Sequence, residues 1–219
     1  MRFLYLSLIL VASLFAHAGE LDHYLYSQGL VDVRKLDRSI QMDLKYATTD
    51  NFLGEQVYEG ITGIWLQEEA AEKLIKAQQL LKKQHPNYSI IVYDASRPMS
   101  VQRKMWNLVR GTNKTNYVSN PANGGGLHNY GMAVDVSIVD ENGVALPMGS
   151  DFDYFGTEAH INKEEELVST GKITPQELKN RRLLRDVMTR AGFRTILYEW
   201  WHFNAVTKSQ AQAKYKLIE

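Results

Sequence analysis

The chain has 219 residues, which is enough for one domain with a sizeable core and hardly enough for two. Lys and Arg together number 25, as do Asp and Glu, so the net charge gives no electrostatic reason to expect a nucleic acid or an anionic membrane surface as partner, although a local cluster could still bind either. Cys is absent, which excludes disulfides and thiolate ligands, so any metal site must be built from nitrogen and oxygen.

The first 18 residues have the pattern of a secretory signal peptide. Met1-Arg2 gives a basic start, residues 3–15 are apolar, and Ala16-His17-Ala18 is an Ala-x-Ala cleavage site. The apolar run is shorter than the roughly 20 residues of a membrane-spanning helix, although an uncleaved signal anchor is the alternative. We expect cleavage after Ala18, a single mature domain of residues 19–219 without a stable membrane anchor, and export to a bacterial periplasm or the cell exterior.

The mature chain predicts strands and helices without strict alternation. Apolar residues with a period of two indicate strands, and apolar residues three or four apart indicate helices. In chain order these patterns predict one or two strands in residues 30–46, an ordered loop at 47–63, a helix at 66–84, a strand at 89–93, a helix at 99–110, a loop at 111–126, a strand at 133–139, a helix at 174–190 and a strand at 193–201. The predicted fold class is α+β, with a mainly antiparallel sheet packed against helices.

The helix that begins at residue 174 has the clearest boundaries. Thr174 is a favourable N-cap, Pro175 fits the first helical position, and Glu177 completes a capping box. Gly192 is a typical residue for the end of the helix.

Three stretches far apart in the sequence together supply the groups of a hydrolytic zinc site. His128, Asp135 and His202 could provide the three protein ligands that catalytic zinc usually takes. Glu199 is a carboxylate base close to the last His, and Arg97 is a positive partner for an oxyanion. Because residues three apart in a regular strand point to opposite faces, Glu199 and His202 can serve one metal only if the chain bends between them.

Each of these signals has an ordinary structural alternative. His128 can be a loop residue, and Asp135 can be a hydrogen-bonded acid in a strand. The segment from Glu199 to His202 can be a buried aromatic strand with a satisfied His, and Arg97 can form a salt bridge. The three signals gain weight because together they fill every role of the site.

At these positions the chain resembles the D-alanyl-D-alanine dipeptidases of the VanX type, zinc enzymes related to D,D-carboxypeptidases and to the Hedgehog fold. The resemblance covers about residues 43–203. Its landmarks are the segments 43–52 (DLKYATTDNF), 93–98 (YDASRP), 128–135 (HNYGMAVD), 148–153 (MGSDFD) and 199–203 (EWWHF).

The resemblance implies a role for eight residues. His128, Asp135 and His202 would bind one zinc ion. Glu199 would be the general base and then the acid that protonates the leaving amine, and Arg97 would stabilise the oxyanion. Asp153 and Tyr46 match positions that hold the substrate's free amino group, and Tyr58 would line the same pocket.

Two features depart from the family pattern. The family usually has Ser two residues before the first zinc-binding His, where it contacts the substrate carboxylate, and this chain has Gly126. Recognition of the carboxylate must then use backbone N–H groups of the glycine run or another side chain. The second departure is the signal peptide, since many relatives are cytoplasmic.

The sequence therefore predicts an exported zinc dipeptidase that acts on D-Ala-D-Ala or a related wall-derived dipeptide. A D,D-carboxypeptidase or endopeptidase acting on peptidoglycan stem peptides is the alternative. Asp153 separates the two, since a clamp for a free amine favours dipeptides. A binding module with structural zinc is a third hypothesis, against which Glu199 and Arg97 argue because neither is needed to hold a metal.

Overall fold

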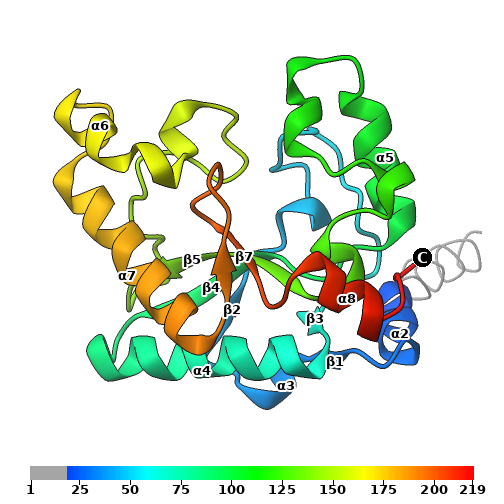
Figure 1. Ribbon diagram of the computed structural model, residues 1–219. Coiled ribbons are helices and arrows are strands. Elements are labelled where there is room, and N and C mark those ends of the chain that lie inside the picture. The colour runs from blue at the N-terminus through cyan, green and yellow to red at the C-terminus, as the bar shows by residue number, and fades with distance from the viewer. Residues whose placement is uncertain (1–18) are drawn as a thin grey trace, which may run out of the picture.

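The structure, a computed structural model, describes residues 19–219. The predicted signal peptide lies outside the described residues. The elements shown in Figure 1 are α2 (Glu20–Ser27), β1 (Val31–Asp32), α3 (Val33–Leu36), β2 (Gln41–Met42), η1 (Lys45–Ala47), β3 (Trp65–Leu66), α4 (Glu68–Gln84), β4 (Ser89–Asp94), α5 (Met99–Val109), η2 (Asn113–Tyr117), η3 (Pro121–Asn123), η4 (Leu127–Tyr130), β5 (Ala133–Val139), η5 (Thr157–Ala159), η6 (Ile161–Lys163), α6 (Glu164–Ser169), α7 (Pro175–Ala191), β6 (Arg194–Thr195), β7 (His202–Asn204) and α8 (Lys208–Lys214).

A five-stranded sheet with the order β2-β4-β5-β7-β6 forms the centre of the fold. Only the β2–β4 pair is parallel, so the predicted α+β class with a mainly antiparallel sheet is confirmed. The middle strand β5 is buried along its whole length, which explains its nearly continuous run of apolar residues. A second, two-stranded sheet pairs β1 with β3.

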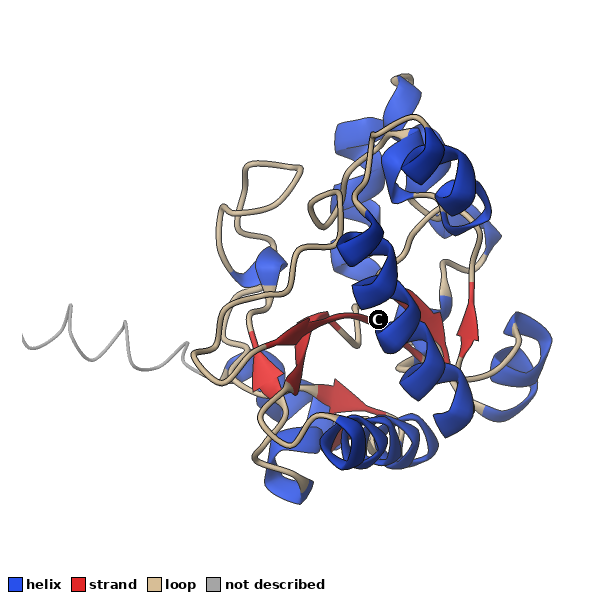
Figure 2. Ribbon diagram, turned by 90° about the vertical axis from the view of Figure 1, so that its left-hand side faces the viewer, coloured by secondary structure: helices blue, strands red, loops and turns tan. Residues whose placement is uncertain are grey.

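Two long helices carry much of the core. On α4 the residues Ala70, Leu74, Ala77 and Leu81, which recur at helical spacing, are buried, and the helix packs against α7 and β4. On α7 the Thr174 hydroxyl accepts a hydrogen bond from the Glu177 backbone N–H, which confirms the predicted capping box. The helix ends at Gly192, whose φ of 105° lies in the left-handed region that glycine adopts without strain. In Figure 2 the strands lie between these helices and a loop-rich part of the chain.

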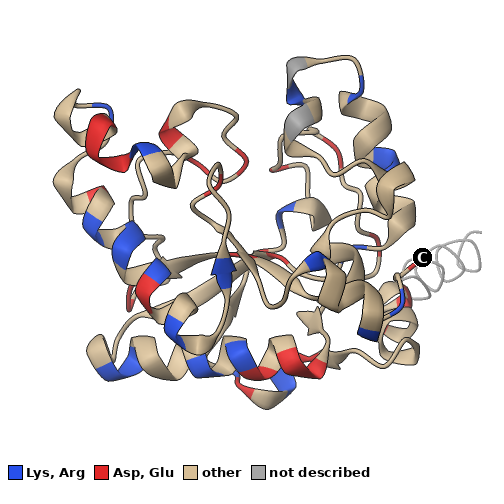
Figure 3. Ribbon diagram, viewed as in Figure 1, with Lys and Arg blue, Asp and Glu red and all other residues tan. Residues whose placement is uncertain are grey.

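Charged residues of both signs are spread over the surface helices. Figure 3 shows Lys and Arg interspersed with Asp and Glu along α4 and α7. No helix among residues 19–219 combines the length and apolarity that crossing a membrane requires.

Two strand predictions need correction. The predicted strand at 193–201 is wrong for most of its length, because only Arg194–Thr195 pairs, and residues 196–201 form a bent connection to β7. Backbone hydrogen bonds explain the difference: the Trp200 N–H bonds the Ala159 carbonyl, and the Leu197 carbonyl bonds the Ile161 N–H. In residues 30–46 the two strands have only two residues each, with the short helix α3 after the first.

Candidate active site

The register of the sheet brings two predicted metal ligands face to face. Asp135 on β5 lies directly opposite His202 on β7, and on its other side it lies opposite Asp94 on β4. His128 comes from η4, just before β5. Residues paired across antiparallel strands have their side chains on the same face, so the pairing itself places Asp135 beside His202.

The three predicted ligands offer atoms that converge on one point. One atom from each of His128, Asp135 and His202 lies within 4.8 Å of the other two. His128 Nε2 is 3.2 Å from His202 Nδ1 and 3.4 Å from an Asp135 oxygen, and His202 Nδ1 is 2.9 Å from the other Asp135 oxygen. Ligands of a tetrahedral zinc ion with bonds of about 2.0–2.1 Å are about 3.3 Å apart. The donor set therefore fits such an ion in spacing as well as in chemistry.

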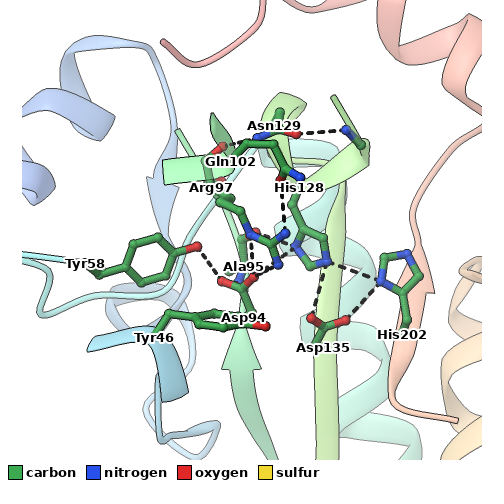
Figure 4. Close-up of polar contacts among 12 residues, drawn as sticks. Tyr46, Tyr58, Asp94, Ala95, Arg97, Gln102, His128, Asn129, Asp135 and His202 are labelled. Atoms are coloured by element: carbon green, nitrogen blue, oxygen red, sulfur yellow. Dashed lines mark hydrogen bonds and ion pairs between the residues drawn. The ribbon is translucent and has the colours of Figure 1, made fainter. Parts of the chain in front are cut away.

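Outward hydrogen bonds fix which nitrogen of each imidazole faces this point. His128 Nδ1 donates to the Ala95 carbonyl at 2.7 Å, and His202 Nε2 donates to the Asn204 side-chain oxygen at 2.8 Å. Each bond leaves the other ring nitrogen with its lone pair directed toward the metal position, as is usual for metal-binding imidazoles. Figure 4 shows the Ala95 contact together with the converging ligands. This role of Asn204 was not predicted from the sequence, although its position two residues after His202 in a strand places both side chains on the same face of the sheet.

Asp135 and His202 also shape each other's ionisation. Burial opposes the charge of Asp135, but the neighbouring imidazoles of His128 and His202 outweigh it and hold the pKa of Asp135 well below its usual range. Burial likewise opposes protonation of His202, yet its hydrogen bond to Asp135 raises the pKa of His202 to about 9. A metal ion must therefore displace a proton from His202 at neutral pH.

We expect the affinity for zinc to rise with pH between 7 and 9, by up to about tenfold per pH unit, because one proton on His202 competes with the metal below its pKa of about 9. Competition titrations with a chromogenic chelator at pH 7, 8 and 9, corrected for the chelator's own protonation, measure this slope. An affinity that stays constant over this interval would contradict the coupling between Asp135 and His202.

Glu199 lies beside the metal position but outside the ligand set. It sits in the bent connection 196–201, and its carboxylate is 4.0 Å from His202 Nδ1. The bend that the sequence required between Glu199 and His202 is present. Burial raises the pKa of Glu199, while the positive charge of His202 counteracts part of the shift. A carboxylate with a raised pKa next to a metal site is suited to accept and return a proton.

Arg97 is held rigidly at the wall of the site. Its Nε and Nη2 donate to Asp94, the former at 3.1 Å, and its Nη1 donates to Gln102 at 3.0 Å. Its guanidinium also lies over the Tyr46 ring, 5.3 Å from the centroid. Burial opposes the charge, but the Asp94 carboxylate more than compensates and holds the pKa of Arg97 well above its ordinary value. Arg97 therefore offers a permanent positive charge.

Tyr58 is placed differently from the prediction. It is not among the residues that line the cavity, and its hydroxyl donates to Asp94 at 2.6 Å, behind the Arg97 guanidinium (Figure 4). Tyr58 thus supports the partner of Arg97. Apart from the spacing of three between Asp94 and Arg97, nothing in the sequence indicates these contacts behind the cavity wall.

Asp153 and Tyr46 meet at one side of the cavity, although 107 positions separate them. The Tyr46 hydroxyl donates to an Asp153 oxygen at 2.8 Å. Asp153 has a φ of 59°, and among residues 19–219 it is the only non-glycine with a positive φ. Burial raises the pKa of the Asp153 carboxyl well above its ordinary value, against the hydrogen bond from Tyr46. A strained, half-buried acid of this kind is suited to bind a cation.

One cavity of about 270 Å³ connects these groups, except for Tyr58 and Asp94. This is slightly below the roughly 300–1,000 Å³ of typical small-molecule sites. Trp201 lines it, whereas the Trp200 ring nitrogen turns away and donates to Ser150 at 2.9 Å. The remaining wall includes Arg97, the metal-ligand cluster, Glu199, Asp153 and Tyr46, and the glycine run before His128.

The donor set with its adjacent carboxylate first defines the class, which is that of the metal-dependent hydrolases. Comparison with known proteins then gives the family. The model of the D-Ala-D-Ala dipeptidase family, peptidase M15, matches residues 26–218, and the chain belongs to this family of peptidases.

Named relatives agree with this assignment. The chain is 31% identical over 174 residues to the D-alanyl-D-alanine dipeptidase of Escherichia coli K12, covering 80% of this chain and 83% of the relative. It is 30% identical over 198 residues to that of Enterococcus faecium, covering 80% and 90%. A solved structure of the LdcB LD-carboxypeptidase aligns with a TM-score of 0.40 and 20% identity, over 68% of this chain and 63% of the other, which is too weak to carry an argument.

Proposed function

We propose that the protein is an exported zinc dipeptidase that hydrolyses D-Ala-D-Ala or a closely related wall-derived dipeptide. The observation that carries this proposal is the position of the Asp153–Tyr46 pair in the same cavity as the convergent ligands His128, Asp135 and His202. The names of the relatives support the same substrate.

Zinc is the proposed metal because of the donor set. Two imidazoles and one carboxylate, with no thiolate, suit zinc better than they suit magnesium or calcium, which prefer all-oxygen sites. When bound, zinc would polarise the scissile carbonyl and make water a better nucleophile at neutral pH. The chain offers one such site among its described residues.

The residues of the chain account for the remaining chemistry. Glu199 would take the proton from the attacking water and later give it to the leaving amine, since it lies 4.0 Å from a ligand nitrogen without being a ligand. Arg97, kept charged by Asp94, would face the negative charge that develops on the carbonyl oxygen. Both Glu199 and Arg97 line the cavity in which these steps would occur.

Asp153 would select substrates with a free amino group. Burial disfavours the charged form of the Asp153 carboxyl, as its raised pKa indicates. The ammonium of a dipeptide in the cavity would stabilise that charge. An acylated amine would leave the carboxylate without a charged partner, which is expensive away from water. Peptidoglycan stem peptides carry such an amide at the corresponding position.

The test compares three substrates with the zinc-loaded mature protein: D-Ala-D-Ala, its N-acetylated form and a pentapeptide stem. We expect rapid release of D-alanine from the free dipeptide and little from the other two. Preferential cleavage of the blocked or long substrate would favour a D,D-carboxypeptidase or endopeptidase instead. Failure to cleave any of them would remove the proposed activity.

Export is the part of the proposal that depends on the first 18 residues. The basic start, the apolar run and the Ala-x-Ala site support processing after Ala18. We expect protein expressed from the full sequence in a Gram-negative host to appear in the periplasmic fraction with Gly19 at its N-terminus. Mass spectrometry of the fractionated protein checks this. A chain recovered intact from the membrane fraction would identify an uncleaved anchor.

A further inference from the structure

The side chain of Ser119 occupies the space that a side chain at residue 126 would need. Gly126 has an extended backbone, with φ −106° and ψ −175°, which any residue can adopt. A Cβ atom built there would lie 2.8 Å from the Ser119 hydroxyl oxygen and 3.4 Å from its Cβ. A side chain at this position would force the Ser119 hydroxyl to move, so the neighbour of Gly126, and not its own conformation, favours glycine here.

Ser119 is held in place by the same network that holds Arg97. Gln102 is fully buried, donates to the Ser119 carbonyl at 2.7 Å and accepts from Arg97 Nη1 at 3.0 Å. The Ser119 hydroxyl lines the cavity and has no hydrogen-bond partner within the part of the chain that the structure describes. The backbone of Ser119 is anchored, and its hydroxyl remains free to bind a ligand.

Lys208 is a cation on the same wall. Its ammonium donates to the carbonyls of Asn123 at 3.0 Å and Gly125 at 2.8 Å, which anchors it beside the glycine run. No carboxylate of residues 19–219 lies within ion-pair distance of it, in contrast to Arg97, which is paired with Asp94. Lys208 thus brings an uncompensated positive charge to the cavity.

Most of the backbone N–H groups in the glycine run already have an acceptor and cannot bind an anion. The Gly126 N–H already donates to the Asn129 side-chain oxygen at 2.8 Å, and the Gly124 N–H donates to the Pro121 carbonyl at 3.1 Å. Of the three glycines, only Gly125 has an N–H without an acceptor within residues 19–219, so an anion at this wall needs side chains as well. Ser119 and Lys208 are the two that flank the run.

The length of a dipeptide requires an anion site close to the metal. Counting from the scissile carbonyl carbon, the amino nitrogen is two bonds away and the terminal carboxylate carbon is three bonds away, each bond about 1.3–1.5 Å long. Both charged ends must therefore be bound in the one small cavity. Asp153 and Tyr46 supply the site for the cation, which leaves the wall with Ser119 and Lys208 for the anion.

We propose that Ser119 and Lys208 bind the C-terminal carboxylate of the dipeptide, with the Ser119 hydroxyl placed where a serine at residue 126 would otherwise present its own. This inference rests on the proposed dipeptidase function and names the residues that make the cavity specific for a free carboxylate. A hydroxyl and an ammonium together provide the hydrogen bond and the charge that a carboxylate needs.

The first test measures binding without turnover. Calorimetry on zinc-loaded protein carrying Glu199→Gln compares D-Ala-D-Ala with D-Ala-D-alaninamide, which lacks the negative charge. We expect Ser119→Ala to weaken binding of the free acid about tenfold and Lys208→Met about 10–100-fold, with little change for the amide, as for lost hydrogen bonds to a charged group. Ser100→Ala and Lys179→Met, at exposed positions outside the cavity wall, are the matched controls.

The second test moves the hydroxyl between the two positions. Gly126→Ser alone should weaken binding of the free acid, because its side chain meets Ser119. The double variant Gly126→Ser, Ser119→Gly removes that clash and should restore binding of the free acid to within about threefold of the parent, a difference of less than 1 kcal/mol. Zinc content and circular dichroism establish that each variant is folded.

The outcomes separate this inference from the proposed function. Hydrolysis of D-Ala-D-Ala by the wild-type protein, combined with unchanged free-acid binding in both single variants, overturns the carboxylate site and leaves the dipeptidase intact. A protein that binds the free acid in preference to the amide but does not cleave it keeps the carboxylate site and loses the dipeptidase. Equal binding of acid and amide by the parent protein overturns the inference directly.

Discussion

Replacement of Glu199 by Gln is expected to reduce kcat for D-Ala-D-Ala by about 10²–10⁴-fold, the range usual for loss of a general base, while zinc still binds. The side chain keeps its shape, so the bent connection 196–201 has no reason to rearrange. Gln cannot accept a proton from water, whereas the three ligand atoms belong to other residues. Steady-state kinetics together with the zinc content of the purified variant measure both parts of this prediction.

The control for this change is Glu141→Gln, an exposed glutamate in the turn after β5, which should leave kcat unchanged. A Glu199→Gln protein with full activity and a full zinc site would show that another group takes the proton. Loss of zinc from the variant would show instead that Glu199 is a ligand, contrary to its position outside the convergent set.

The metal-ligand cluster could be predicted from the sequence because two of its three members lie opposite each other on paired strands. Residues 133–139 form the predicted strand, and once β7 pairs with it, Asp135 and His202 become direct neighbours. His128 lies between the glycine run and the start of the same strand. Residue type and family resemblance indicate all three positions, the predicted strand 133–139 carries Asp135, and the structure places the three together.

The parts that could not be predicted depend on contacts between segments without periodic patterns. Residues 193–201 have the apolar composition of a strand, but hydrogen bonds to Ala159 and Ile161 bend the chain away from the sheet. Ser119 lies in a segment of turns and 3-10 helices, and nothing in its local sequence shows that its hydroxyl faces Gly126. Contacts of this kind depend on the tertiary arrangement, which no local propensity encodes.

The structure bears on one of the two departures from the family pattern, the glycine at residue 126. The glycine at residue 126 acquires a physical explanation, because a side chain there and the Ser119 hydroxyl in its present position would compete for the same space. A pair of this kind preserves the chemistry of the cavity while its position in the sequence changes. The metal ligands, Glu199 and Arg97 are untouched by it, so the substitution bears on substrate recognition and not on the bond-breaking step.

Replacement of Asp153 by Asn is expected to lower kcat/KM for D-Ala-D-Ala by about 10–150-fold, the equivalent of one hydrogen bond to a charged group. Asn is the right substitution because Asp153 has a φ of 59°, a conformation that Asn adopts at least as readily as Asp. The Tyr46 hydroxyl can still donate to the remaining side-chain oxygen, so the local structure should persist while the negative charge is lost.

The decisive readout is the ratio of kcat/KM for the free dipeptide to that for its N-acetylated form. If Asp153 enforces the need for a free amine, this ratio falls in the variant, because an acylated amine no longer leaves a buried charge unpaired. Asp151→Asn, two residues earlier and exposed, tests whether any loss of negative charge in this loop has the same effect. A ratio that stays constant in Asp153→Asn would mean that the shape of the cavity, and not the charge of Asp153, excludes longer peptides.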